Sequence, residues 1–253
     1  MYNDILKIGP LTIHGYGLMI GLGVLCALLV ASKRAKSRQL NEDTVYSLGM
    51  VALVFGFIGA KLLYCIIEIK EFISDPLQVL SGNGFVVYGG LIGGILAAFV
   101  YCKRKNISFL RYFDLTAPSI ALAQGFGRIG CFLAGCCYGR ETESGIGIVF
   151  HDSLFAPNDI RLLPTQLLSS AGNFLIAAIL LIYARKEHRA GKVGALYLLL
   201  YSVGRFMIEF LRNDYRGNLG ILSTSQFISL LIFVIGIGLF FIKNIPGMNK
   251  QGS

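Results

Sequence analysis

Residues 117–139 read APSIALAQGFGRIGCFLAGCCYG, an apolar stretch of mostly small residues that contains one charge, Arg128. A second long apolar stretch, GALYLLLYSVGRFMIEFLR at residues 194–212, is interrupted in a similar way by Arg205. A charge at membrane depth costs at least a few kcal/mol, so such a residue usually faces an interior cavity with a partner. The two arginines therefore indicate a buried site for an anion, and the commonest anion in a membrane is a lipid phosphate.

The composition extends this interpretation to the whole chain. Of 253 residues, 55% are hydrophobic and only 15% are charged, and the mean hydropathy is +0.66. A transmembrane helix needs about 20 mostly apolar residues. About seven stretches qualify, at residues 16–32, 45–68, 85–102, 113–136, 165–184, 193–211 and 219–242. We therefore predict an all-α, polytopic integral membrane protein with about seven transmembrane helices, in which residues 1–253 form a single transmembrane domain.

The basic residues behind the net charge of +9 are distributed as a membrane topology requires, not as a nucleic-acid-binding surface would be. Basic residues gather in alternate connections and in the tail: Lys33, Arg34, Lys36, Arg38; Lys103, Arg104, Lys105, Arg111; Arg185, Lys186, Arg189, Lys192; Lys243 and Lys250. The intervening connections contain Glu68, Glu71, Asp75, Glu141, Glu143, Asp152 and Asp159. The positive-inside rule then places the N-terminus outside and the C-terminus in the cytoplasm. We predict no nucleic-acid partner.

Polar residues of six predicted helices fall at one depth. With a rise of 1.5 Å per residue, Arg128 lies roughly 22 Å and Arg205 roughly 18 Å from the inner end of its helix. The residues predicted in the outer half of the bilayer are Arg128, Arg205, Lys61, Tyr16, Tyr88 and Gln166. This convergence indicates one central site that opens toward the outer leaflet or the outer water.

The helix predicted around Arg205 has a polar face of its own. Tyr201, Arg205, Glu209 and Arg212 are spaced i, i+4, i+8 and i+11, which places them on one side of a helix. Glu209 either only neutralises the arginines or holds a guanidinium group toward a phosphate. We favour the second interpretation, because a purely structural pair could be replaced by leucines.

Three of the six cysteines, Cys131, Cys136 and Cys137, follow Arg128 closely. A redox or metal role is one interpretation, but a structural zinc site usually has four ligands, and the three histidines are scattered. Adjacent cysteines also pair poorly with each other. We therefore expect these cysteines to be small apolar filler, and we predict no metal and no soluble cofactor.

The stretch GRIGCFLAGCCYG resembles the signature of the bacterial prolipoprotein diacylglyceryl transferases. Further similar stretches are HGYGLMIGLG, GAKLLYCI, GFVVYGGLIGG, LPTQLL and YSVGRFMIEFLR, followed by STSQFIS. They run along almost the entire chain in the order of a seven-helix enzyme. The combination is much more specific than any one of the stretches.

The resemblance implies a transferase of the bacterial cytoplasmic membrane. It would move the diacylglyceryl group of phosphatidylglycerol to the lipobox cysteine thiol in the signal peptide of a prolipoprotein and release glycerol phosphate. Arg128 and Arg205 would bind the phosphate and stabilise the charge on the leaving group. Tyr16, Tyr201 and Glu209 match residues of the family's site. We count Tyr88 among the catalytic residues, Gln166 and Lys61 among the substrate-binding ones, and we expect a monomer surrounded by membrane lipids.

The chain also departs from the family pattern. Tyr88 stands where many members have histidine, Cys131 where an asparagine often follows GRIG, and Ser169 where an acidic residue is frequent. A divergent paralogue with a different acceptor therefore stays open as an interpretation. So do an anion or lipid transporter that uses the same arginines and a thiol oxidoreductase built on the three cysteines. The transporter lacks polar residues in the inner half, and the oxidoreductase lacks a C-x-x-C pair.

Overall fold

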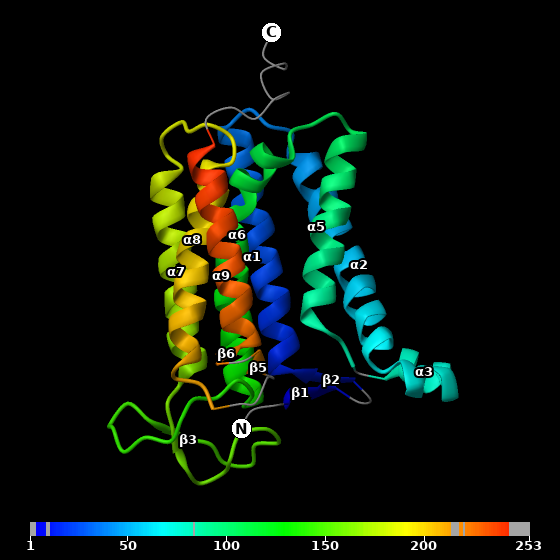
Figure 1. Ribbon diagram of the computed structural model, residues 1–253, viewed down its shortest axis with the longest axis vertical. Coiled ribbons are helices and arrows are strands. Elements are labelled where there is room, and N and C mark those ends of the chain that lie inside the picture. Colours follow the sequence, from blue (N-terminus) through cyan, green and yellow to red (C-terminus); the bar gives the residue numbers. More distant parts are fainter. Residues whose placement is uncertain (1–3, 9–10, 83, 214–217, 220, 243–253) are drawn as a thin grey trace. The chain divides into compact units, whose positions relative to one another are not determined.

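A computed structural model describes residues 4–8, 11–82, 84–213, 218–219 and 221–242, and the chain is mostly helical (Figure 1). Each predicted span overlaps one long helix. The helices of 18 residues or more within the described residues are α1 (Gly15–Ser37), α2 (Glu42–Ile67), α5 (Val87–Arg104), α6 (Phe109–Ala134), α7 (Thr165–Tyr183), α8 (Lys192–Glu209) and α9 (Thr224–Phe241). Two predicted tail charges, Lys243 and Lys250, lie outside the described residues.

Four of these helices, α1, α2, α7 and α9, are long and apolar enough to cross a membrane. The other three carry more charge or more small and polar residues. In particular, α8 contains both Arg205 and Glu209, and α6 contains both Asp114 and Arg128. Two of the three less apolar helices, α6 and α8, are therefore the ones that contain Arg128 and Arg205.

The connections hold structure that the sequence pattern does not predict. Two short helices, α3 (Ile69–Ser74) and α4 (Pro76–Ser81), follow α2. Three antiparallel strand pairs are β1 (Asp4–Ile8) with β2 (Leu11–His14), β3 (Ile148–Val149) with β4 (Arg161–Leu162), and β5 (Asn218–Leu219) with β6 (Leu222–Ser223). The last helix therefore begins at Thr224, not at residue 219, because Ser223 and Gln226 form a capping box at its start.

The chain divides into two compact units. The first comprises Met1–Ala31 with Phe113–Ser253, and the second comprises Ser32–Tyr112. In the second unit α2 packs closely on α5 through glycines. A Cβ atom on Gly59 would collide with the carbonyl oxygen of Gly89, and one on Gly93 would collide with that of Phe55. Small residues allow this approach of helix backbones.

In the first unit, α7 and α9 pack on either side of α8 (Figure 1). A cluster of buried side chains joins α6, α7 and α8 and includes Ala117, Ala121, Ile176, Ala177, Leu180, Val193 and Tyr197. Tyr197 also donates a hydrogen bond from its hydroxyl to Gln124 Oε1, 3.0 Å away on α6. These contacts fix α8, the helix with the ion pair, against α6, the helix with Arg128.

The start of α8 is held by a carboxylate from α6. Gly191, at φ 93°, precedes α8, and its N–H donates to Asp114 Oδ2 at 2.6 Å. The N–H of Gly194 donates to Asp114 Oδ1 at 2.7 Å. A carboxylate at a helix N-terminus satisfies free donors and complements the helix dipole. Asp114 therefore sets the position of α8 along α6.

We expect Asp114→Ala to lower the free energy of unfolding by about 1–2 kcal/mol, since it removes both of these hydrogen bonds. The measurement is denaturant unfolding of the purified protein in detergent. The matched control is Asp43→Ala, because Asp43 is an exposed carboxylate in the first turn of α2. Equal stability of the two variants would contradict a role of Asp114 in holding α8.

Candidate functional site

The centre of the site is an ion pair on α8. Arg205 Nη1 lies 2.6 Å from Glu209 Oε2, and the side chains are only 11% and 9% exposed. The predicted i, i+4 contact between these residues is therefore present. A buried ion pair gains little net stability, because the desolvation of both charges offsets their attraction. The net stability that the pair adds is therefore small, and its role toward an anion stays a prediction.

Two serines of the last hairpin and helix hold this ion pair from the other side. Arg205 Nη2 donates to Ser225 Oγ at 2.7 Å, and Ser223 Oγ donates to Glu209 Oε1 at 3.0 Å. Ser225 is 4% exposed. The N-terminus of α9 also favours a carboxylate beside it through its dipole. Arg205 and Glu209 are therefore oriented by two helices, as a preorganised site requires.

Among the described residues, guanidinium groups outnumber carboxylates around Arg205. Its guanidinium group interacts electrostatically with two others, Arg128 and Arg212, and with one carboxylate, Glu209. Arg128 is partly buried on α6 and has no hydrogen bond or ion pair with any of the residues that the structure describes. Like charges that share a site repel each other unless an anion offsets them. An anion site at these arginines therefore stays a prediction, and Arg128 is the arginine whose guanidinium group has no hydrogen bond or ion pair among the described residues.

Two of the predicted tyrosines lie in this unit beside the arginines. Tyr16, in the first turn of α1, is 44% exposed and interacts electrostatically with Arg128. Gly130 leaves room for it, because a Cβ there would lie 3.2 Å from the ring of Tyr16. Tyr201 stacks on Tyr197 with ring centroids 5.8 Å apart and interacts electrostatically with Arg205.

Gln166 belongs to the wall of this site rather than to its open surface. It is 1% exposed, and its Nε2 donates to the carbonyl of Cys136 at 2.8 Å. Thr165 Oγ1 donates to the carbonyl of Cys137, also at 2.8 Å. The first turn of α7 thereby holds the segment that follows α6. Gln166 Oε1 is buried and has no hydrogen-bond partner among the described residues.

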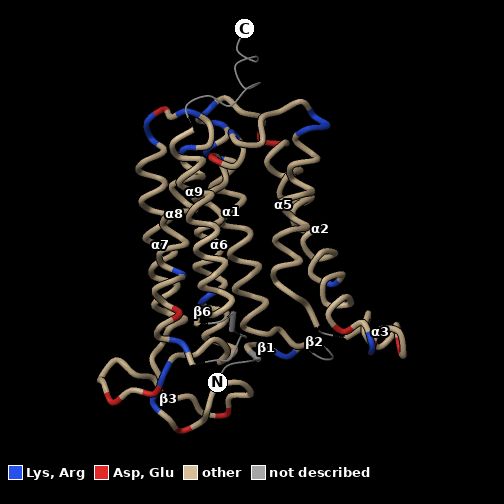
Figure 2. Tube along the Cα trace, viewed as in Figure 1, with Lys and Arg blue, Asp and Glu red and all other residues tan. Residues whose placement is uncertain are grey.

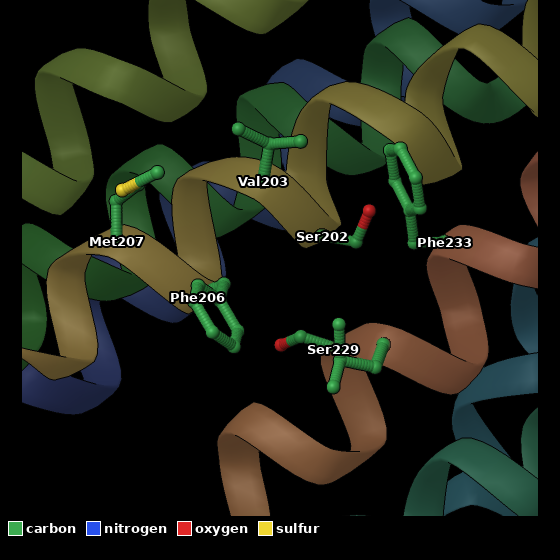
Figure 3. A pocket seen from close by; sticks show the side chains of 7 residues that line it. Ser202, Val203, Phe206, Met207, Ser229 and Phe233 are labelled. Carbon is green, nitrogen blue, oxygen red and sulfur yellow. The ribbon is translucent and has the colours of Figure 1, made fainter.

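An apolar groove of about 140 Å³ lies between α8 and α9 (Figure 3). Its lining residues are Ser202, Val203, Phe206, Met207, Ser229, Leu230 and Phe233. The two serine hydroxyls donate to carbonyls of their own helices, Leu199 and Ser225, so that the lining stays apolar in character. Ser229 is one helical turn from Ser225, the residue that contacts Arg205. The groove therefore starts beside the ion pair.

The remaining two predicted site residues, Lys61 and Tyr88, belong to the second unit. Lys61 Nζ donates to the carbonyls of Gly82 and Gly84 at 2.7 and 3.3 Å and lies 4.8 Å from the ring centroid of Phe85. Lys61 thus binds the segment between α4 and α5 to α2. Tyr88, in the first turn of α5, is 38% exposed. Their roles toward a substrate stay predictions.

The sequence analysis did not single out three residues that shape the site: Ser225, Ser223 and Asp114. One signal was available, because S-x-x-Q at residues 223–226 is the pattern of a capping box. It would have placed the start of α9 at this point. Nothing in the sequence marks Ser225 as the partner of Arg205, since that contact depends on how α8 and α9 pack.

Comparison with known proteins identifies the family of this chain. The family model described as prolipoprotein diacylglyceryl transferase matches residues 3–242. The phosphatidylglycerol–prolipoprotein diacylglyceryl transferase of Clostridium tetani is 52% identical over 95% of this chain and 96% of its own. Two proteins of Clostridium perfringens with that name, numbered 2 and 1, are 46% and 35% identical, each over 97% of this chain and over 97% and 95% of their own. The chain therefore belongs to the prolipoprotein diacylglyceryl transferase family.

Proposed function

We propose that this protein transfers the diacylglyceryl group of phosphatidylglycerol to the lipobox cysteine thiol of prolipoproteins and releases glycerol phosphate. The observation that carries the proposal is the group of guanidiniums in the first unit. Arg205 is oriented by Glu209 and Ser225, while Arg128 has no hydrogen bond or ion pair among the described residues. A transporter or an acceptor other than a prolipoprotein is not favoured by the three relatives described above, which are named as transferases of this kind.

The phosphate of the lipid headgroup fits this excess of positive charge. Arg128 offers a planar fork that can bind two phosphate oxygens at once. The apolar groove between α8 and α9 begins one turn away and suits an acyl chain in its chemistry. A cation beside an apolar groove is the combination that a phospholipid requires. Tyr16 and Tyr201 would border the headgroup, and Gln166 would shape the wall.

In the reaction, the acceptor thiolate attacks the carbon that carries the phosphate ester oxygen. A C–S bond forms, the C–O bond breaks, and the electron pair leaves with glycerol phosphate. Negative charge develops on the leaving group, where Arg128 and Arg205 would stabilise it. The same two guanidinium groups would favour the thiolate form of the acceptor over the thiol, because nearby positive charge stabilises the thiolate.

The topology that we propose has seven transmembrane helices, an outer N-terminus and a cytoplasmic C-terminus in the bacterial cytoplasmic membrane. In the first unit, the connection between α7 and α8 is rich in lysine and arginine, whereas the loop with β3 carries aspartate and glutamate (Figure 2). The positive-inside rule supports the orientation. Residues 1–253 would act as one catalytic domain, because α1 and α6 each continue from one unit into the other. We propose a monomer.

The direct test uses purified protein, phosphatidylglycerol labelled in its acyl chains and a lipobox peptide. We expect the label to move to the peptide and glycerol phosphate to appear in equal amount. A peptide with serine in place of the lipobox cysteine is the control. Labelled lipid that crosses a vesicle membrane without reaching the peptide would contradict the proposal and favour a transporter.

Tyr88 is expected to hydrogen-bond the headgroup or thiol without being the sole base. Tyr88→Phe should then slow transfer, because the activation free energy rises by the contribution of one hydrogen bond, about 0.5–3 kcal/mol depending on charge. Tyr88→His should stay active, because the family resemblance implies that histidine is accepted at this position. The measurement is the transfer rate across a pH series.

The matched control for Tyr88→Phe is Tyr46→Phe, which removes an exposed hydroxyl from α2. Complete loss of turnover in Tyr88→Phe with lipid binding retained would make Tyr88 the essential base. A folded but inactive Tyr88→His would show that the similarity at α5 does not extend to the chemistry.

A further inference from the structure

Three cysteine side chains meet at the end of α6, and the proposed reaction uses none of them. The sulfur atoms of Cys131, Cys136 and Cys137 all lie within 4.8 Å of one another. None of the three forms a disulfide with a described residue, and all three are partly buried. The expectation that they are apolar filler does not account for this convergence, because Cys136 and Cys137 are adjacent in the chain and would ordinarily point in different directions.

The backbone around the cysteines explains the convergence. Gly135 and Cys137 have φ values of 74° and 63°. Positive φ is uncommon outside glycine, so the conformation of Cys137 is held by its surroundings. The holding contacts come from α7: Gln166 bonds the carbonyl of Cys136, and Thr165 bonds that of Cys137. These contacts from α7 therefore hold the turn in the conformation that brings the three sulfur atoms together.

We propose that Cys131, Cys136 and Cys137 bind a thiophilic divalent cation of the zinc class. With Zn–S bonds of about 2.3 Å, tetrahedral sulfurs lie about 3.8 Å apart. The separations of the three sulfurs, at most 4.8 Å, need to close by no more than about an ångström. Three protein ligands with one open position is also the pattern of catalytic rather than structural zinc.

The charge of such a site suits its position. Three thiolates around a divalent cation carry one net negative charge. Arg128 is one turn before Cys131 on α6 and interacts electrostatically with it. The guanidinium group would offset that charge in a region where an unpaired charge is costly. The thiolate of Cys131 would therefore have a guanidinium group near it.

The open position suits an external thiol, and this step rests on the proposed function. An acceptor thiol that binds the cation loses its proton to water and stays as a thiolate. That sulfur then forms the C–S bond as the C–O bond to phosphate breaks, and the cation keeps its three protein ligands. The cation would thereby supply the thiolate without a side-chain base.

The first experiment tests metal binding alone, without any assay of transfer. The reduced, metal-free full chain in detergent is titrated with Cd²⁺ and Co²⁺. We expect one ion per chain and thiolate-to-metal charge-transfer absorption. The triple variant Cys131→Ala, Cys136→Ala and Cys137→Ala should lose both. The matched control replaces the three other cysteines, Cys26→Ala, Cys65→Ala and Cys102→Ala, and should keep both.

Single variants keep the test decisive where a triple variant fails to fold. Cys131→Ala alone should weaken Cd²⁺ affinity by more than the roughly 10–100-fold expected for a change outside the ligand shell. Absence of binding by the wild-type protein would overturn the proposal. So would equal stoichiometry in the two triple variants, or unchanged affinity in all three single variants of the cluster.

The second experiment tests the open position. A lipobox peptide is added to the Co²⁺-loaded protein, with a serine peptide as the control. We expect the visible spectrum to change with the cysteine peptide alone. An unchanged spectrum would overturn thiol activation while leaving the metal site in place. Metal binding without any transfer of labelled lipid would instead contradict the proposed function, so the two failures can be told apart.

Discussion

Arg128→Lys is expected to lower the rate of diacylglyceryl transfer by about 10²–10³-fold, the range for loss of one donor that stabilises developing negative charge. Lysine keeps the charge but loses the planar fork that binds two oxygens. Arg128 is the guanidinium with no hydrogen bond or ion pair among the described residues, so its donors remain for a ligand. The measurement is the initial transfer rate at saturating phosphatidylglycerol.

Membrane insertion and folding should be unaffected, because no described contact of the fold depends on this guanidinium. Arg185→Lys is the matched control, since Arg185 is exposed in the connection after α7. It changes the same chemical group at a position without a role in the site. Near-normal activity of both Arg128→Lys and Arg128→Ala would remove the phosphate role from this residue.

Features that depend on one helix could be predicted from the sequence. Hydropathy located the long helices, and bilayer physics marked Arg128 and Arg205 as residues that need a partner. The spacing of Arg205 and Glu209 gave their contact, because residues four apart share a helix face. Each inference needs only the geometry of one element, which is why each could be made without knowing how the helices pack.

Features that depend on how two elements meet could not be predicted. The bond between Arg205 and Ser225 requires the register of α8 against α9. The contacts of Asp114 with the start of α8 join residues about 80 positions apart. The cysteine cluster requires the positive φ of Cys137, which a Cys-Cys pair in the sequence does not indicate. Short-range patterns carry no information on these registers or on a conformation that distant residues impose.

The largest stability effects are expected at the buried ion pair. Arg205→Met or Glu209→Leu alone leaves one charge buried without its partner, which should cost about 3–5 kcal/mol of unfolding free energy. Either single variant should also lose transfer, but that loss alone would not separate catalysis from folding. Unfolding in detergent and transfer rate are therefore measured on the same preparations, with the exposed substitution Ile182→Met on α7 as the control.

The double variant Arg205→Met with Glu209→Leu distinguishes the two interpretations of the pair. Replacing both charges by apolar side chains of similar size is often neutral or stabilising, so the double variant should regain most of the stability that either single variant loses. A pair that serves the structure alone would then regain transfer along with stability. A pair that orients a guanidinium toward phosphate would not, because the double variant has lost that donor. We expect a stable protein without transfer activity, and an active double variant would assign the pair to the fold.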